Sequence, residues 1–189
     1  NMADIPWGSE EAHKFVTNVG LITSNGPFGH NVMAAEWTHH VSYSPGLIMV
    51  NVGYNKATEA NILKTKEFGV SIAASDQNVA SSVSGGSTGK EVDKIKVLEG
   101  LGIEFYRAKR INTLMVKGAA MNAECRLVKA EKLGDHWMFV GEVLAAAAGG
   151  KEPLIFGGGS YWEFGGRVQK PPKETIAKIN TLVEKYRKK

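Results

Sequence analysis

The chain has 189 residues, of which 43% are hydrophobic and 22% are charged, and its formal net charge is +4 at pH 7. This composition excludes an intrinsically disordered or membrane-embedded chain, and the length predicts a single domain over residues 1–189. The modest positive charge suits an anionic ligand, but it falls short of the basic surface typical of nucleic-acid-binding proteins.

Short apolar segments dominate the first three quarters of the chain. They are rich in β-branched or aromatic residues and are bounded by Gly, Pro, Asn or Asp, a pattern typical of β-strands. The last two flank the turn sequence Gly134-Asp135, which predicts that they pair as an antiparallel hairpin. The predicted strands cover residues 13–23, 47–52, 68–74, 111–116, 123–133 and 136–148.

Helical patterns are fewer. The segment 58–66 begins with Thr58, a suitable N-cap residue, and ends in lysines, an arrangement that capping and the helix dipole favour. Two shorter segments, 79–84 and 93–99, also predict helices. Because many short strands alternate with few helices, we expect a mainly β fold whose sheet forms a closed or nearly closed barrel.

The basic tail, residues 170–189, predicts an amphipathic helix over 172–188. Ile176, Ile179 and Val183 follow the spacing i, i+3, i+7, which places them on one face of a helix. An apolar face of this kind must cover another surface, either on the barrel itself or on a second subunit.

Two Gly-rich segments, 84–89 and 157–166, are predicted to be functional loops, because structured sequence encloses each of them. The first is not a P-loop, since that pattern requires Gly and a later Ser or Thr where this chain has Ser84 and Glu91. No strand–GxGxxG–helix unit occurs in the sequence either. Any NAD(P)H is therefore expected to bind without a Rossmann domain.

Cys125 is the only cysteine, which excludes an intrachain disulfide and any all-cysteine metal site, and we expect it to be a small buried strand residue. His39 and His40 are adjacent, so on a strand they should point to opposite faces, and no metal site is predicted. The lone thiol, with no secretion signal and no apolar run near the ~20 residues of a membrane span, predicts a cytoplasmic protein.

A phosphate site is predicted where Lys56 and Thr58 meet the start of a helix. The first turn of a helix offers unpaired N–H groups and a partial positive charge, and a lysine and a hydroxyl beside it would complete an anion site. Upstream, Ala34 and Ala35 put two small side chains on a predicted strand, where a flat ring could approach the backbone closely. These features together favour a phosphorylated, planar ligand.

The order of these segments resembles the flavin reductase-like family, whose fold is the FMN-binding split β-barrel, a Greek-key type of barrel. The resemblance covers nearly the whole chain and depends on several short motifs in the correct order. They are a small-residue strand at 33–37, V-S-x-x-P at 41–45, T-x-x-N-I at 58–62, E-F-x-V at 67–70, Asp-Lys at 93–94, small-E-C at 123–125, G-E-V at 141–143 and P-L…G-x-Y at 153–161.

The resemblance implies FMN as cofactor and NAD(P)H as co-substrate, with hydride transferred to N5 of the flavin. No catalytic side chain is implied, because the cofactor carries the chemistry. A homodimer with the flavin near its interface is also implied, and the tail 170–189 is a candidate clamp between subunits. Three functions stay open: an NAD(P)H-dependent flavin or ferric reductase, a flavoredoxin-like electron carrier with a protein partner, and a cofactor-free barrel that binds nucleic acid.

The resemblance further assigns the cofactor's surroundings. The isoalloxazine ring would lie along the small-residue strand, the ribityl chain beside the next apolar strand, and the phosphate at the helix start, under a covering loop. The cofactor-binding residues so implied are Ala34, Ala35, Glu36, Trp37, Thr38, Asn51, Val52, Gly53, Lys56, Thr58, Asn61, Ser71, Ala73, Ser87, Thr88 and Lys94. Tyr161 and Trp162 would form the nicotinamide face. Common members carry small hydroxyl residues at the positions of Glu36 and Trp37, so the local hydrogen bonding differs here.

Overall fold

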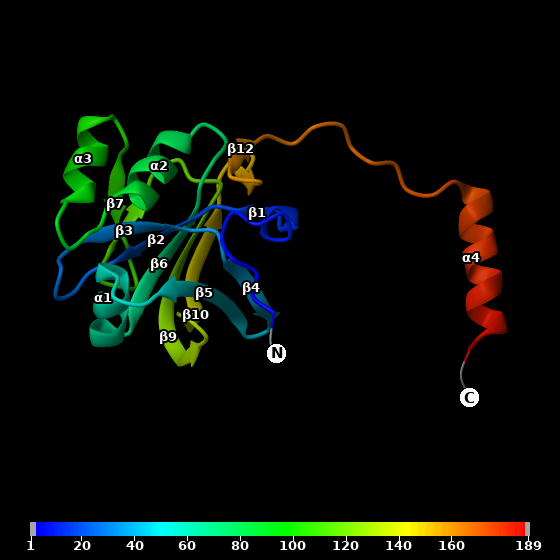
Figure 1. Cartoon of the computed structure of the whole chain (residues 1–189), viewed down its shortest axis with the longest axis horizontal. Helices are drawn as coiled ribbons and strands as arrows, with labels where there is room; N and C mark the ends of the chain where they lie inside the picture. Colours follow the sequence, from blue (N-terminus) through cyan, green and yellow to red (C-terminus); the bar gives the residue numbers. More distant parts are fainter. Residues whose placement is uncertain (1–2, 188–189) are drawn as a thin grey trace.

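A seven-stranded antiparallel sheet forms the body of the protein in a computed structural model that describes residues 3–187 (Figure 1). The strand order is β3-β2-β6-β9-β10-β5-β4. The two edge strands, β3 and β4, are consecutive in the chain, and only Glu36 and Trp37 connect them. The sheet therefore curls until its edges approach each other, which gives the predicted split barrel. The strands are β2 Gly20–Ser24, β3 Asn31–Ala35, β4 Thr38–Tyr43, β5 Gly46–Gly53, β6 Glu67–Ile72, β9 Met121–Leu133 and β10 His136–Ala148.

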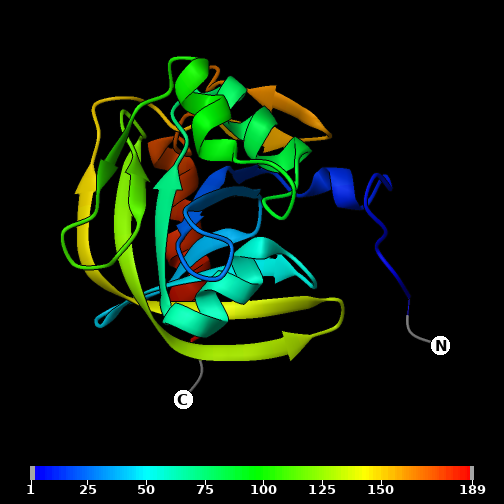
Figure 2. The ribbon, with the colours of Figure 1, turned by 90° about the vertical axis from the view of Figure 1, so that its left-hand side faces the viewer.

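Two small sheets and three helices surround the barrel. In Figure 2 the strands of the main sheet curve round a common interior, with α2 and α3 on one side of it. One small sheet has the order β1-β11-β12, and the other pairs β7 with β8. These elements are β1 Thr17–Asn18, β7 Phe105–Arg107, β8 Leu114–Val116, β11 Ile155–Gly157, β12 Ser160–Trp162, the 3-10 helix η1 Ala12–Lys14, α1 Ala57–Thr65, α2 Asn78–Gly86 and α3 Lys94–Gly100.

Apolar side chains fill the barrel in two adjoining clusters. Phe68 and Phe139 are fully buried in the first cluster, which lies between the central strands and α1. Leu98 of α3 and Val32 of β3 belong to the second, which lies under α2 and α3. Cys125 is completely buried in β9, as predicted, and burial raises the pKa of its thiol to about 12. Since the thiolate is the reactive form, this cysteine is a packing residue.

The predicted hairpin is confirmed, because Leu133 pairs with His136 and Gly134 adopts a positive φ of 58°. The strand predicted over 13–23 is correct only in part. Residues 12–14 form a 3-10 helix and the strands begin at Thr17, because the exposed side chains of Phe15 and Val16 have no strand partner there.

The strand predicted over 111–116 is also shorter than expected, since β8 covers Leu114–Val116 alone. The backbone of the preceding loop bonds to carboxylate side chains and does not pair with a neighbouring strand. The Glu124 side chain accepts hydrogen bonds from the backbone N–H groups of Lys109 and Arg110, and Glu67 accepts one from Asn112. Those backbone donors are therefore satisfied without a sheet ladder.

Helix α4, Lys173–Lys185, stands away from the barrel at the end of an extended segment (Figure 1). It lies within the predicted 172–188, and of that range Lys188 is outside the described residues. All of its described residues are exposed, including Ile176, Ile179 and Val183 on the predicted apolar face. Within residues 3–187 no helix combines the length and the hydropathy needed to cross a membrane.

Candidate functional site

A cavity of about 1110 Å³ runs along β3, the end of β5 and the start of α1. The N-terminal arm, residues 5–17, bounds one side of it, and the loop after α2 bounds another. Twelve of the sixteen residues assigned to the cofactor by family resemblance line this cavity. They are Ala34, Ala35, Glu36, Trp37, Thr38, Asn51, Gly53, Lys56, Thr58, Ser87, Thr88 and Lys94.

The other four of the sixteen have side chains outside the cavity lining. Val52 and Ala73 are fully buried in the apolar core. The Asn61 amide joins α1 to the 24–29 turn, since it donates to the Gly29 carbonyl and to the Ser24 hydroxyl. Ser71 donates to the Asn122 side chain inside the barrel. The hydrogen-bonding groups of these side chains are used by the fold, so no side-chain contact with a ligand in this cavity follows for them.

Tyr161 and Trp162 of β12 also lie outside the lining. The Tyr161 hydroxyl donates to Ser81 Oγ at 3.0 Å, and the Trp162 indole donates to the Gly157 carbonyl at 2.8 Å. The same Gly-rich segment contributes Gly158 and Gly159 to the cavity wall instead. The segment predicted as a loop is therefore partly a hairpin of β11 and β12, and it reaches the site through the glycines of its turn.

The start of α1 forms a polar end of the cavity. Thr58 was predicted to be the N-cap of this helix, and that prediction is wrong. Lys56 occupies the N-cap position, and Thr58 lies in the first turn. The Thr58 hydroxyl accepts a hydrogen bond from the Asn31 amide at 3.0 Å. Gly89 packs so closely on this pair that a Cβ atom there would overlap the Asn31 side chain. The close approach thus brings the backbone of the covering loop directly over the helix start.

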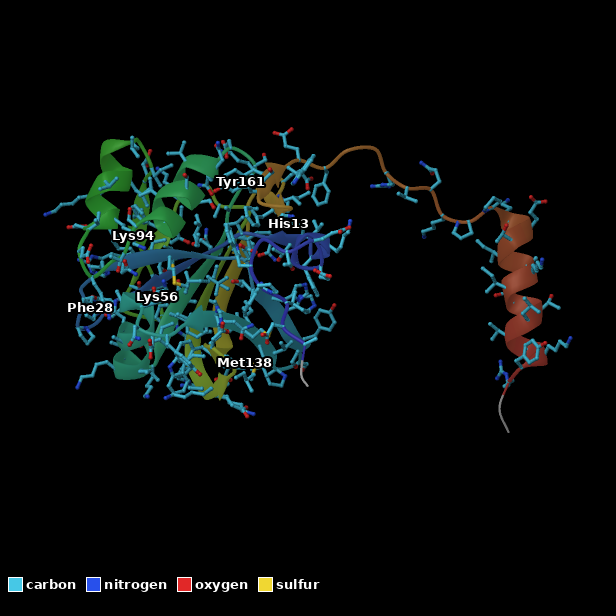
Figure 3. The ribbon with its side chains drawn as sticks, in the orientation of Figure 1. His13, Phe28, Lys56, Lys94, Met138 and Tyr161 are labelled. Carbon is cyan, nitrogen blue, oxygen red and sulfur yellow. The ribbon has the colours of Figure 1, made fainter. Side chains whose placement is uncertain are left out.

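Lys94 lies at the same end and is almost completely buried, with 3% of its surface exposed. Its ammonium group donates to the carbonyl oxygens of Ser84 at 2.9 Å and Ser87 at 3.1 Å. No carboxylate among the described residues forms an ion pair with it. Burial, and next the positive charge of Lys56, lower the pKa of Lys94 to about 8. Figure 3 shows Lys56 and Lys94 on the same side of the barrel.

Besides the Lys94 ammonium without a counter-charge, this end of the cavity holds a hydroxyl without a hydrogen-bond partner. That hydroxyl is the buried Oγ of Ser84. Ser84 lines the cavity together with Lys94. A buried ammonium group without a counter-charge and a buried hydroxyl without a partner are both costly in a folded protein. An anionic oxygen group bound between them would satisfy both, so the residues present fit the phosphate of a flavin nucleotide.

An aromatic pair forms the wall next to Lys56. The Trp37 ring lies 4.6 Å from the His136 ring, measured between centroids, and His136 Nδ1 is 2.6 Å from an Asp135 carboxylate oxygen. The hydrogen bond from His136 lowers the pKa of Asp135. Gly53 lies between the two positions, since a Cβ atom added there would be 3.6 Å from Lys56 Cε and 3.7 Å from His136 Nε2. The two rings are tilted by 42° to each other, and aromatic rings that line a cavity can pack against another planar group.

Asp135, His136 and the N-terminal arm were not identified as site residues from the sequence. Asp135 was interpreted only as part of a turn, and the turn itself brings His136 opposite Gly53 of β5. The arm places Trp7 and Phe15 along the cavity, although its sequence predicts only part of a strand. His13 of this arm and Lys56 both line the cavity, and Figure 3 shows them well apart on the body of the protein.

Three polar residues in or near the cavity have properties that the sequence did not indicate. Glu36 is half-buried, and burial raises the pKa of its carboxyl. His39 and His40 were expected on opposite faces, but their rings lie 4.4 Å apart. Both are exposed on the edge strand β4, whose pairing with β5 is irregular just after His40, so the two side chains can lean together.

Sequence relatives share much of this chain. It is 32% identical over 123 residues to an uncharacterized protein of Archaeoglobus fulgidus, an alignment that covers 63% of this chain and 66% of that protein. The chain therefore spans about two thirds of the length of that relative. It is 27% identical over 152 residues to the FMN reductase (NADH) SmoA of Agrobacterium fabrum, covering 79% of this chain and 80% of that protein.

Solved structures agree with the observed fold. Flavoredoxin from Methanosarcina acetivorans superposes with a TM-score of 0.76 at 24% identity and covers 93% of this chain and 99% of its own. BorF, the flavin reductase component of a bacterial two-component tryptophan halogenase, superposes with a TM-score of 0.71 at 28% identity, covering 81% and 93%. The profile of the family described as "Flavin reductase like domain" matches residues 12–165. The chain therefore belongs to the flavin reductase-like family, as the order of its motifs predicted.

Proposed function

We propose that this chain binds a flavin nucleotide in the 1110 Å³ cavity and reduces it with NADH or NADPH. The observation that carries the proposal is the buried Lys94 ammonium, which has no counter-charge among the described residues and donates to the backbone carbonyl of Ser84, the residue whose buried hydroxyl has no partner. A folded protein tolerates such a pair where a ligand completes it. Relatives named as NADH-dependent flavin reductases support the same conclusion.

Each part of the cavity has a role in this proposal. The flavin phosphate would lie between Lys56, Lys94 and the first turn of α1, where charge and N–H groups converge. The ring system would lie along Ala34 and Ala35, whose small side chains leave the strand accessible. When bound, the flavin supplies the two-electron chemistry, so the protein needs to bind and orient rather than to provide an acid or base.

The remaining space suits the nicotinamide. Ligand pockets commonly enclose about 300–1,000 Å³, and this cavity, at about 1110 Å³, is slightly larger than that range. The tilted pair Trp37 and His136 lines this cavity together with residues of the N-terminal arm. A second planar ring placed here would be held against the flavin and shielded from water. We therefore propose this wall, rather than Tyr161 and Trp162, as the nicotinamide side.

Stopped-flow reduction tests the proposal directly. Flavin-loaded protein mixed anaerobically with NADH or NADPH is expected to lose its visible flavin absorbance within seconds, because the proposed site would hold both rings in one cavity. Protein that binds flavin but stays oxidised with either nucleotide would contradict the reductase and favour an electron carrier. Protein that neither quenches added flavin nor retains it would contradict the flavin site itself.

We further propose that the chain forms a homodimer clamped by α4. The apolar face of α4 is exposed and has no partner among residues 3–187, and Trp7 and Tyr43 on the body are also strongly exposed. Sedimentation equilibrium is expected to give twice the chain mass for residues 1–189 and a lower apparent mass for a variant truncated after Gly166. A full-length chain that sediments as a monomer at micromolar concentration would contradict this assembly.

A further inference from the structure

Asn31, the first residue of β3, forms a buried hydrogen bond with Thr58 at the start of α1. Its amide nitrogen lies 3.0 Å from the Thr58 hydroxyl oxygen, and the two residues are 3% and 1% exposed. Both line the cavity, at the end where Lys56 and Lys94 lie. Asn31 is outside the small-residue motif at 33–37, so the sequence gave no reason to place it in the site.

The direction of this hydrogen bond decides which way the Thr58 proton points. The amide N–H of Asn31 donates, and the Thr58 oxygen accepts. A hydroxyl group can accept and donate at the same time, so its own proton stays available for a second hydrogen bond. No acceptor among residues 3–187 takes that proton. The Thr58 hydroxyl is therefore a donor that faces the cavity without a partner.

The other groups at this end of the cavity are also able to donate. The N-cap side chain is that of Lys56, which has no acceptor atom for the N–H groups of the first turn. The Lys94 ammonium has no carboxylate partner among the described residues, and the buried Ser84 hydroxyl has no partner at all. A ligand that meets these donors together must present several acceptor oxygens, as a phosphate group does.

We infer that Asn31 is a positioning residue, which holds the Thr58 hydroxyl with its proton directed to the flavin phosphate. Asn31 acts through Thr58 and not through a ligand contact of its own. The inference rests on the proposed flavin site and explains how that site distinguishes FMN from riboflavin, which has the same ring and lacks the phosphate. A hydroxyl that is fixed before the ligand arrives loses less conformational entropy on binding.

Gly89 of the covering loop keeps the Asn31 side chain in this orientation. A Cβ atom at residue 89 would overlap Asn31 Oδ1. The Thr88 carbonyl accepts hydrogen bonds from the backbone N–H groups of Glu91 and Val92, and the turn so closed holds Gly89 in place. Gly89 does not have a positive φ, so this close contact, and not backbone strain, disfavours a side chain there. A methyl group at position 89 should therefore displace the Asn31 amide.

Titration of flavin-free protein with FMN and with riboflavin tests the inference, with quenching of flavin fluorescence as the readout. Thr58→Val removes the hydroxyl and is expected to weaken FMN binding by about tenfold or more, the effect of one hydrogen bond to a charged group. Asn31→Leu removes the amide at similar size and is expected to weaken FMN binding by about fivefold. Both should change riboflavin binding by less than about twofold, because riboflavin has no phosphate to lose a contact.

The double variant separates positioning from direct contact with the ligand. Because Asn31 acts through the Thr58 hydroxyl, Asn31→Leu should weaken FMN binding no further once Thr58→Val has removed that hydroxyl. The rate of flavin reduction by NADH at saturating FMN should stay within about twofold of wild type, since the ring is bound along another part of the cavity. Losses that multiply in the double variant would show an independent role for Asn31 and overturn the inference. An equal loss of FMN and riboflavin in Asn31→Leu would overturn it as well, because a packing defect would then explain the result.

Gly89→Ala tests the same hydrogen bond from the covering loop, and it keeps the inference testable where Asn31→Leu does not fold. It is expected to weaken FMN binding by about fivefold and riboflavin binding by less than about twofold. Gly100→Ala is the matched control, because a Cβ atom there meets nothing within 4 Å and residue 100 lies outside the cavity. Unchanged FMN binding in both Asn31→Leu and Gly89→Ala would overturn the inference and leave the flavin site intact. Wild-type protein that binds neither FMN nor riboflavin would overturn the proposed function itself.

Discussion

Lys94→Met is expected to weaken flavin binding by about 100-fold without lowering the stability of the unliganded protein. A charge-assisted hydrogen bond in a buried site contributes roughly 1.5–3 kcal/mol, and each 1.4 kcal/mol is a factor of about ten in affinity. In the absence of ligand the same ammonium group is buried without a counter-charge. Methionine fills a similar volume without that charge, which offsets the loss of the hydrogen bonds to Ser84 and Ser87.

Two measurements separate binding from folding in this variant. Flavin titration gives the affinity, and urea denaturation of flavin-free protein gives the free energy of unfolding. Lys64→Met is the matched control, because Lys64 is exposed on α1 and does not line the cavity. If Lys94→Met bound flavin as tightly as Lys64→Met, Lys94 would have no part in phosphate binding. If it unfolded much more easily, Lys94 would be a structural residue instead.

The barrel was predictable because its residues follow local rules. The hairpin at Gly134 and the helix beginning near Thr58 depend on turn chemistry and capping, which neighbouring residues determine. Strand boundaries were less predictable where a distant side chain intervenes. The loop before β8 is an example, since Glu124 lies on another strand and nothing near Lys109 and Arg110 in the sequence indicates its contact with them.

The site residues that belong to the family motifs could be predicted from the sequence. The contacts that depend on how distant segments pack together could not. Lys56 was predicted from its place at a helix start and Lys94 from family resemblance, but the burial of Lys94 without a counter-charge among the described residues is visible only once α2 and α3 are packed. Asn61 was assigned to the cofactor by resemblance but has a structural role. Its amide donates hydrogen bonds that join α1 to the 24–29 turn. His136 was missed because the turn that places it opposite Gly53 carries no chemical motif.

The stability of the flavin-free protein is expected to rise with pH between about 8 and 10.5, because of Lys94. Burial lowers the pKa of Lys94 from 10.5 to about 8 in the folded chain, so in this window the unfolded chain binds the proton and the folded chain does not. Stability increases with pH wherever the unfolded state binds more protons. At 1.36 kcal/mol per pKa unit, the contribution of this one group is about 3 kcal/mol.

Flavin binding should follow the opposite trend, because the phosphate binds the protonated ammonium. Affinity is expected to fall above about pH 8 by up to about tenfold per pH unit. Urea denaturation of wild type and Lys94→Met at pH 7, 8, 9 and 10 gives the free energy of unfolding of each protein. The difference between the two values isolates the contribution of Lys94, since the contributions of the other titrating groups cancel. That difference is expected to be largest at pH 7 and to shrink towards pH 10. A difference independent of pH would show that Lys94 keeps its ordinary pKa in the folded chain, and flavin affinity should then not fall between pH 8 and 10.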